Sequence, residues 1–283
     1  MKIENLKLKI IFFGSSNYVI PIIEVLKKNF ELALVVTTEK SQGAVPSYCQ
    51  ENKISYLFLQ QFNNLTIQQL QVIKAPIAVL ADFGLIIPEG ILNAFPKGII
   101  NLHPSLLPKY RGPTPVQSAI LEGEKTTGIS IIKLDKEIDH GPILGQEKEE
   151  ILDTDTAESL YKRLFEKGAN LLLKALNSYL KDNLKLTTQK HENATFTKPL
   201  TRQDGFVNLS SPLEIRNLKL KIRAYFPWPS AWSKLVVRSQ KSAVRIKFLP
   251  GNLIQVEGKK PMTYKDFLNG YPEAKEILGE IIS

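Results

Sequence analysis

The residues of this chain best suited to chemistry lie in the segment 98–112. An apolar run predicts a strand at its start, and Asn101 and His103 point to the same side of that strand because side chains alternate. Pro104 and Pro108 then stiffen the loop that follows. An amide N–H can stabilise a developing oxyanion, and an imidazole can move a proton or add a second donor. The pair therefore favours acyl-type chemistry, with a turn-capping asparagine and an ordinary core histidine as the alternative.

The segment 135–142 offers this pair a carboxylate. It follows an apolar run at 127–134 that predicts another strand, and it contains Asp135 and Asp139. Either carboxylate could orient His103. Either could equally cap a turn of its own loop. Composition and spacing do not choose between them.

The elements that must position these residues form an α/β pattern. Helical patterns at 18–28 and 88–95 lie between nearly continuous apolar runs. Buried strands alternating with helices predict a mostly parallel sheet with helices on both faces, whose carboxyl edge binds ligands. A long amphipathic helix, which we expect Asp155 to cap with Glu158 at the capping-box position, closes this first domain. The strands are predicted at 7–13, 31–38, 75–83, 98–103, 127–134 and 142–151.

The rest of the chain predicts a second, smaller domain with a strong positive charge. Residues 181–204 are polar and weakly patterned, which is typical of a linker. A helix is predicted at 212–224, and short β runs follow at 231–237, 244–249 and 252–256. Residues 205–249 hold nine Lys or Arg against one acidic residue, so this stretch carries +8 of the chain's formal net charge of +9. Such a local excess attracts phosphate backbones, although a solvated basic surface is the alternative.

Several classes of site and location are disfavoured by what the sequence lacks. The single cysteine, Cys49, excludes an internal disulfide and a Cys-rich metal site. We see no histidine-based metal motif and no Gly-rich phosphate loop, so we expect no metal. No apolar run approaches the roughly 20 residues that span a bilayer. We therefore expect a cytoplasmic monomer without a membrane partner.

The motifs in the first domain resemble the formyltransferase family that uses 10-formyltetrahydrofolate. The resemblance is carried by Asn101-Leu-His103, Ser105-Leu-Leu-Pro108, Tyr110-Arg-Gly112, Thr127-Gly-Ile-Ser130 and Ile138-Asp139-His-Gly-Pro-Ile143. It implies that Asn101, His103 and Asp139 form the catalytic trio, and it thereby selects Asp139 over Asp135. It also implies a folate site, made of Phe83, Gly84, Leu85, Ile86, Ser105, Leu106, Leu107 and Pro108. For the segment Phe83–Ile87, simple core packing is the alternative.

The segments 194–201, 222–232 and 262–270 resemble the linker and C-terminal domain of the methionyl-tRNA formyltransferase branch of that family. This implies a Rossmann-like catalytic domain at 1–183, a linker at 184–204 and an OB-like β-barrel at 205–283 that contacts tRNA. The basic stretch at 205–249 lies inside this last domain. The residues expected to contact tRNA are Lys40, Arg216, Lys219, Lys221, Arg223, Lys234 and Arg238.

The reaction that the resemblance implies moves a formyl group from 10-formyltetrahydrofolate to the α-amino group of methionine on initiator tRNA and leaves tetrahydrofolate. Asn101 would donate to the oxyanion, His103 would assist, and Asp139 would orient His103 and help relay the proton. The segment 37–46 is shorter and less basic than the family's loop that grips the acceptor end, so it does not explain how initiator tRNA is discriminated. A sugar-nucleotide amine N-formyltransferase and an RNA-binding module on an inactive scaffold are the alternatives.

Overall fold

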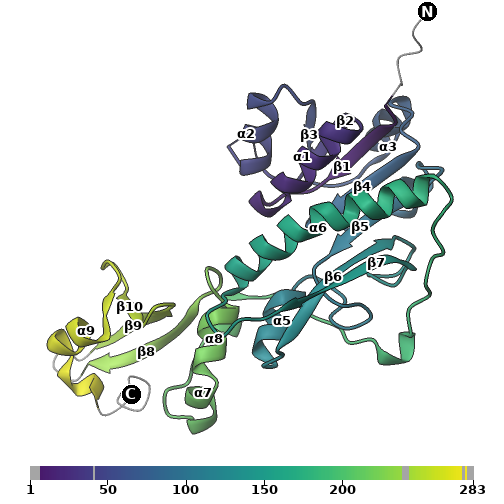
Figure 1. Ribbon diagram of the computed structural model, residues 1–283. Coiled ribbons are helices and arrows are strands. Elements are labelled where there is room, and N and C mark those ends of the chain that lie inside the picture. Colours follow the sequence, from purple (N-terminus) through teal and green to yellow (C-terminus); the bar gives the residue numbers. More distant parts are fainter. Residues whose placement is uncertain (1–6, 41, 238–241, 276–277, 279–283) are drawn as a thin grey trace, which may run out of the picture. The chain divides into compact units, whose positions relative to one another are not determined.

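The computed structural model describes residues 7–40, 42–237, 242–275 and 278 (Figure 1). The chain divides into two compact units, each built from separate stretches of sequence. The first unit comprises Met1–Gly112, Thr126–Glu150 and Tyr161–Phe196. The second comprises Pro113–Lys125, Ile151–Leu160 and Thr197–Ser283. Among the described residues, no helix is long and apolar enough to cross a membrane.

The first unit contains a seven-stranded sheet with the order β3-β2-β1-β4-β5-β6-β7. The first five strands in that order pair in parallel, and β6 pairs antiparallel with both of its neighbours, β5 and β7. The mostly parallel sheet predicted from the sequence is thus confirmed. Strand order reverses between β1 and β4, which creates a topological switch point at the carboxyl edge. The strands are β1 (Lys9–Phe13), β2 (Glu31–Thr37), β3 (Tyr56–Phe58), β4 (Ile77–Ala81), β5 (Ile99–His103), β6 (Thr126–Lys133) and β7 (Ile143–Glu150).

Helices cover both faces of this sheet (Figure 1). On one face, α3 (Asn64–Val72) and α4 (Glu89–Leu92) pack their buried apolar residues against Ile11 and Phe13 of β1. On the other face lies α6 (Ala157–Leu180), from Tyr161 onward. Gly168 permits its close approach, because a Cβ there would stand 2.6 Å from Leu102 Cδ1. The ring of Tyr161 stacks on Tyr18, which ties α6 to the start of the chain.

Some elements differ from the sequence prediction. The predicted cap of α6 is wrong: the helix begins after Thr156, whose Oγ1 accepts the N–H of Ser159 at 3.2 Å, while Asp155 accepts the N–H of Leu152 instead. Pro21 stands in the first turn of α1 (Ile20–Asn29), where its missing N–H costs no hydrogen bond. The prediction missed β3, a three-residue strand at the sheet edge. The remaining elements of the first unit are η1 (Asn17–Val19), α2 (Ala44–Glu51) and η2 (His191–Asn193).

The second unit has its own core and a four-stranded antiparallel sheet, with the order β11-β10-β9-β8. The helix predicted at 212–224 is two helices, because Asn217 takes a non-helical conformation between them. This small sheet is consistent with the barrel-like domain expected from the sequence. Its elements are α5 (Pro115–Leu121), η3 (Arg202–Gly205), α7 (Pro212–Arg216), α8 (Leu218–Ala224), β8 (Ala231–Val237), β9 (Ser242–Leu249), β10 (Leu253–Val256), β11 (Met262–Thr263), α9 (Tyr264–Gly270) and η5 (Pro272–Ala274).

Candidate active site

An amide, an imidazole and a carboxylate meet at the carboxyl end of β5. Asn101 and His103 come from that strand and are each 5% exposed, and Asp139 comes from the loop that joins β6 to β7. The Asn101 amide Nδ2 donates to Asp139 Oδ1 at 3.2 Å. The Nδ1 atom of His103 lies 3.5 Å from Asp139 Oδ2. The structure therefore brings the three residues predicted as catalytic to one place.

Asp135, the other carboxylate of this loop, serves a different partner. Its Oδ2 lies 2.6 Å from the Nδ1 atom of His140, and its Oδ1 accepts the N–H of Glu137 at 3.0 Å. The ring of His140 in turn stacks on His191, with 3.9 Å between the ring centroids. Spacing alone could not separate Asp135 from Asp139, but these contacts do.

His103 has its nearest partner in the loop that follows β5. Its Nε2 atom lies 2.9 Å from the carbonyl oxygen of Tyr110. A carbonyl only accepts hydrogen bonds, so this contact assigns a proton to Nε2 and leaves Nδ1 facing Asp139. Tyr110 has a φ of 60°, in the left-handed region that a bulky residue rarely adopts. This turn of the backbone aims its carbonyl at the imidazole.

Asp139 also takes a left-handed conformation, with a φ of 49°. Its Oδ2 accepts the backbone N–H of Gly112 at 2.8 Å. One carboxylate therefore accepts from the β5 strand through Asn101 and from the following loop through Gly112. The side chain is 13% exposed, so it opens only slightly to solvent.

Polar side chains of β6 and β7 form hydrogen bonds with the backbone of the loop predicted to hold folate. Ser105 is buried and its hydroxyl donates to the Lys109 carbonyl at 2.7 Å, so it shapes the loop from within. Ser130 donates to the Ser105 carbonyl at 2.6 Å and accepts the N–H of Leu107 at 3.0 Å. Gln146 donates to the Leu107 carbonyl at 2.8 Å. Sequence reasoning missed Ser130 and Gln146 as supports, because their partners are backbone groups.

Leu106 and Pro108 of the same loop are half-buried. Leu106 packs on the backbone of Gly128 in β6, where a Cβ would stand 2.5 Å from Leu106 Cδ2. A glycine at this position is therefore required for the loop to lie against the sheet. The four residues from Ser105 to Pro108 form a stiff edge beside the trio.

The other predicted folate segment, residues 83–86, splits between core and surface. The ring of Phe83 packs edge-on against Phe13 with 5.4 Å between the centroids, and Leu85 packs on the same core. Gly84 is exposed, and Ile86 is 82% exposed. Core packing thus describes Phe83 and Leu85, whereas Gly84 and Ile86 remain accessible to a ligand.

A stretch inside the predicted linker contacts the loop that follows β5 and the loop that joins β6 to β7, which we call the catalytic loops because they adjoin or carry the residues predicted as catalytic. We call residues 187–196 the connecting segment. Thr187 exchanges two backbone hydrogen bonds with Ile143, at 2.8 and 3.0 Å. Further along, Thr195 Oγ1 accepts the N–H of Tyr110 at 2.8 Å, and the Thr195 carbonyl accepts the N–H of Arg111 at 2.8 Å. The polar, unpatterned sequence of this segment gave no signal of such a role.

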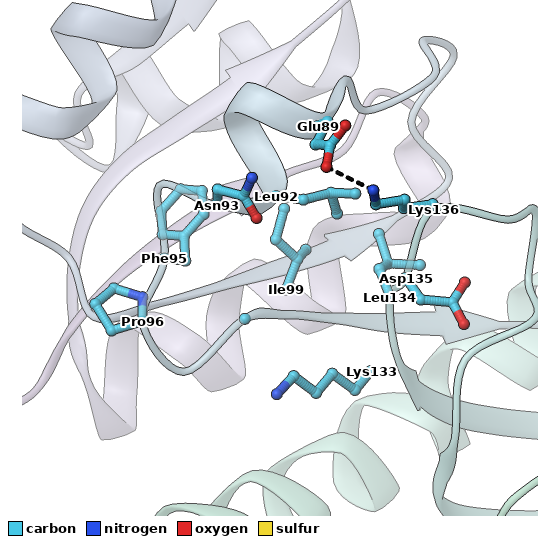
Figure 2. A pocket seen from close by; sticks show the side chains of 11 residues that line it. Glu89, Leu92, Asn93, Phe95, Pro96, Ile99, Lys133, Leu134, Asp135 and Lys136 are labelled. Atoms are coloured by element: carbon cyan, nitrogen blue, oxygen red, sulfur yellow. Dashed lines mark ion pairs between the residues drawn. The ribbon is translucent and has the colours of Figure 1, made fainter.

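A cavity of about 390 Å³ lies at the opposite end of β5, near Gly98 and Ile99 (Figure 2). Lys136 and Glu89 form an ion pair of 2.7 Å at its margin. Its described lining includes none of the predicted catalytic or folate residues. The cavity therefore belongs to the other edge of the sheet and not to the edge where Asn101, His103 and Asp139 meet.

The residues predicted to contact tRNA differ in how they are engaged. Lys40, Arg216, Lys219 and Lys234 are exposed. Lys221, by contrast, donates to Glu214 and to the carbonyl of Phe206. Arg223 donates to the carbonyls of Asp155 at 2.7 Å and Leu152 at 2.6 Å. Arg238 lies outside the described residues.

Across the described part of the chain, no group of three or more His, Cys, Asp or Glu side chains could hold a metal ion.

Comparisons with known proteins place this geometry in context. Residues 8–176 match the family model described as Formyl transferase. The methionyl-tRNA formyltransferase of Carboxydothermus hydrogenoformans is 33% identical, covering 96% of this chain and 99% of that protein. A 4-N formyltransferase from Francisella tularensis shares the fold with a TM-score of 0.68 at 18% identity, covering 87% of this chain and 99% of that one. An N-formyltransferase from Helicobacter canadensis, solved with folinic acid and dTDP-3-aminofucose, has a TM-score of 0.65 at 19% identity, covering 88% and 95%.

Proposed function

This chain belongs to the methionyl-tRNA formyltransferase family, and we propose from that premise that it formylates the α-amino group of methionine carried by initiator tRNA, with 10-formyltetrahydrofolate as the donor. The observation that carries the proposal is the meeting of Asn101, His103 and Asp139 around one point at the carboxyl edge of the sheet. An amide can stabilise the oxyanion of an acyl transfer to an amine, and an imidazole oriented by a carboxylate can move the proton.

Each member of the trio has a distinct task in this proposal. An asparagine amide has two N–H donors, and Asn101 gives one to Asp139, which leaves the other to donate to the formyl oxygen as negative charge develops there. Since Nε2 of His103 is held by the Tyr110 carbonyl, Nδ1 is the atom that can accept a proton from the attacking amine. Asp139 faces that atom and stabilises the charge that the imidazole gains. As the tetrahedral intermediate collapses, the bond between the formyl carbon and the folate nitrogen breaks, and Asp139 and His103 relay the amine's proton to that departing nitrogen, which leaves tetrahydrofolate.

The donor set fits a formyl carrier, because the trio presents a hydrogen-bond donor and a proton acceptor together. When bound, the folate supplies the formyl group that the amine takes up. We propose that the stiff edge from Ser105 to Pro108 holds its ring system together with the exposed Gly84 and Ile86, while Phe83 and Leu85 support that segment from the core. Leu107 is fixed for this role by Ser130 and Gln146.

For tRNA we propose the exposed members of the predicted basic set as contacts, namely Lys40 and the group of Arg216, Lys219 and Lys234. Their accessible cations can neutralise phosphates, which supplies most of the affinity for a nucleic acid and makes it salt-dependent. Lys221 and Arg223 contribute less in this proposal, because their cations already have protein partners.

We further propose the domain boundaries expected from the sequence, with a catalytic domain at 1–183, a linker at 184–204 and a tRNA-binding domain at 205–283.

We also propose that the protein acts as a monomer in the cytoplasm. Its single thiol, Cys49, is buried, and burial raises the pKa of this thiol to about 11, which suits a chain that makes no disulfide. Light scattering of the purified protein measures the number of chains.

The deciding experiment offers 10-formyltetrahydrofolate with charged initiator Met-tRNA and, in parallel, with a panel of nucleotide-linked amino sugars. We expect formylation of the Met-tRNA only. Activity confined to an amino sugar would transfer the protein to the sugar formyltransferases. Binding of RNA without folate binding or turnover would identify the protein as an RNA-binding module on an inactive scaffold.

A further inference from the structure

We infer that Gln189 of the connecting segment is a positioning residue for Asp139, an inference that rests on the proposed function. Gln189 is 4% exposed although it lies in the predicted linker. Its Nε2 donates to the Asp139 carbonyl at 2.9 Å and to the Gly141 carbonyl at 2.7 Å. Both amide hydrogens are thus spent on the turn that carries the carboxylate.

This turn needs such support because its backbone is unusual. Asp139 stands in the left-handed region, which is unfavourable for a residue with a side chain. Its carboxylate is engaged with Asn101 and Gly112, so the backbone must be held by other groups. On the far side of the turn, a Cβ at Gly141 would lie 1.8 Å from the Lys133 carbonyl, so the turn is pressed against β6 there. Gln189 holds the same turn through its hydrogen bonds to the Asp139 and Gly141 carbonyls.

The orientation of the Gln189 amide is fixed by a buried arginine. Arg111 is 3% exposed, and its Nη2 donates to Gln189 Oε1 at 2.7 Å. A guanidinium only donates, so the amide must turn its oxygen to Arg111 and its NH₂ group to the two carbonyls.

Arg111 also joins this support to the first loop. It lies between Tyr110, whose carbonyl meets His103, and Gly112, whose N–H meets Asp139. Gln189 therefore links the turn that carries the carboxylate to the loop that holds the imidazole.

The consequence is that losing the two donors of Gln189 lets the Asp139 carboxylate move relative to the substrate. Displacement of about 1 Å in an active site can lower a rate on the order of 10²-fold. We expect Gln189→Glu to lower kcat by about 10- to 100-fold while the KM values for folate and tRNA change by less than about 3-fold. The glutamate keeps the size and the oxygen for Arg111 but has no hydrogen to give the carbonyls.

A matched control carries the same change of charge elsewhere. Gln71 is exposed at the end of α3, and Gln71→Glu should leave both kcat and KM unchanged. If Gln189→Glu does not fold, Gln189→Asn keeps the amide but shortens its reach by one methylene, and the same parameters are measured on that variant.

A double-mutant cycle separates positioning from a general structural role. Gln189 acts through Asp139, so in an Asp139→Ala background the second substitution should lower the single-turnover rate by less than about 3-fold. An equal loss in both backgrounds would overturn the inference. An unchanged kcat in Gln189→Glu, with an active wild-type protein, would overturn it as well and leave the proposed function intact.

A readout that does not need activity covers the remaining case. If the wild-type protein formylates nothing, the proposed function fails, and hydrogen exchange of the peptide covering 135–142 still tests the inference. We expect faster exchange in Gln189→Glu than in Gln71→Glu. Equal exchange in the two variants would overturn the inference.

Discussion

The proposed catalytic edge of the first unit and the basic stretch 205–249 of the second unit engage their polar groups in different ways. At the proposed catalytic edge, His103, Asn101 and Asp139 each have a close partner that fixes their direction. In the basic stretch, Lys219 and Lys234 are exposed, whereas Arg223 donates to backbone carbonyls. The three predicted catalytic residues thus lie in contact with one another, whereas the basic residues that were counted into the net charge of 205–249 differ in whether their cations are exposed.

This difference follows from how each region is encoded. The position of Asn101 and His103 depends on strand geometry, which repeats every two residues and can be read from an apolar run. A net charge describes the long-range field and says nothing about which cation is free. The largest tests of this comparison are therefore at the catalytic edge, and the smaller ones are in the second unit.

The largest expected effect is at Asn101. Asn101→Ala removes the proposed oxyanion donor, so turnover should fall by about 10²- to 10³-fold. Single-turnover kinetics with saturating substrates measures this loss, and thermal unfolding checks that the fold is kept. A rate close to that of the wild-type protein would remove Asn101 from the mechanism.

The next effect is on stability, at Arg223. Arg223→Ala leaves the carbonyls of Leu152 and Asp155 without their charged donor, which should lower the free energy of unfolding by about 1–3 kcal/mol. Urea unfolding followed by circular dichroism measures this change. A variant that is as stable as the wild-type protein but binds tRNA weakly would place Arg223 among the residues that contact tRNA.

The exposed cations should show the opposite behaviour. Replacing Arg216, Lys219 and Lys234 together with alanine should weaken tRNA binding by about ten-fold at low salt and reduce the salt slope by roughly 0.7–0.9 for each phosphate that is no longer neutralised. Stability should change by less than about 0.5 kcal/mol per site. The Kd measured over a series of salt concentrations decides this, and an unchanged slope would contradict the assignment.

The smallest effect concerns Asp204, which holds η3 in the second unit. Hydrogen bonds from the Thr201 hydroxyl, from Lys198 and from the Thr201 backbone lower the pKa of Asp204 from 3.8 to about 2. Because the folded-state pKa is depressed, the stabilisation is present above about pH 4 and is lost as the pH falls toward 2. We expect Asp204→Asn to lose about 1 kcal/mol at pH 7, after allowance for solvent screening. The difference in Tm from the wild-type protein should shrink between pH 5 and pH 3, and a constant difference would contradict this origin.

The sequence predicts the sheet well because its strands are buried on both faces. Long apolar runs such as 75–83 and 98–103 have no other place than the centre of a parallel sheet. The edge strand β3, which is only three residues long, was missed. Asn217 divides the helix predicted at 212–224, and the apolar spacing on either side gave no sign of that break.

The candidate site could be predicted only in part. Asn101 and His103 follow from the strand, but the choice of Asp139 needed the resemblance, since Asp135 fits the spacing equally well. Gln189 could not be predicted, because its partners are backbone carbonyls that every residue has, 48 and 50 positions away. Hydrogen bonds from a side chain to a distant main chain leave no pattern in a single sequence.

The path of the connecting segment has a consequence for the order in which the molecule is made. The family match ends at residue 176, and the strands of the first sheet are complete by Glu150, yet Gln189 and Thr195 contact the catalytic loops from beyond both points. A nascent chain that has left the ribosome only as far as residue 183 would have its sheet but not the braces on those loops. These loops would then gain their supporting hydrogen bonds late in synthesis, once the residues up to Phe196 have emerged.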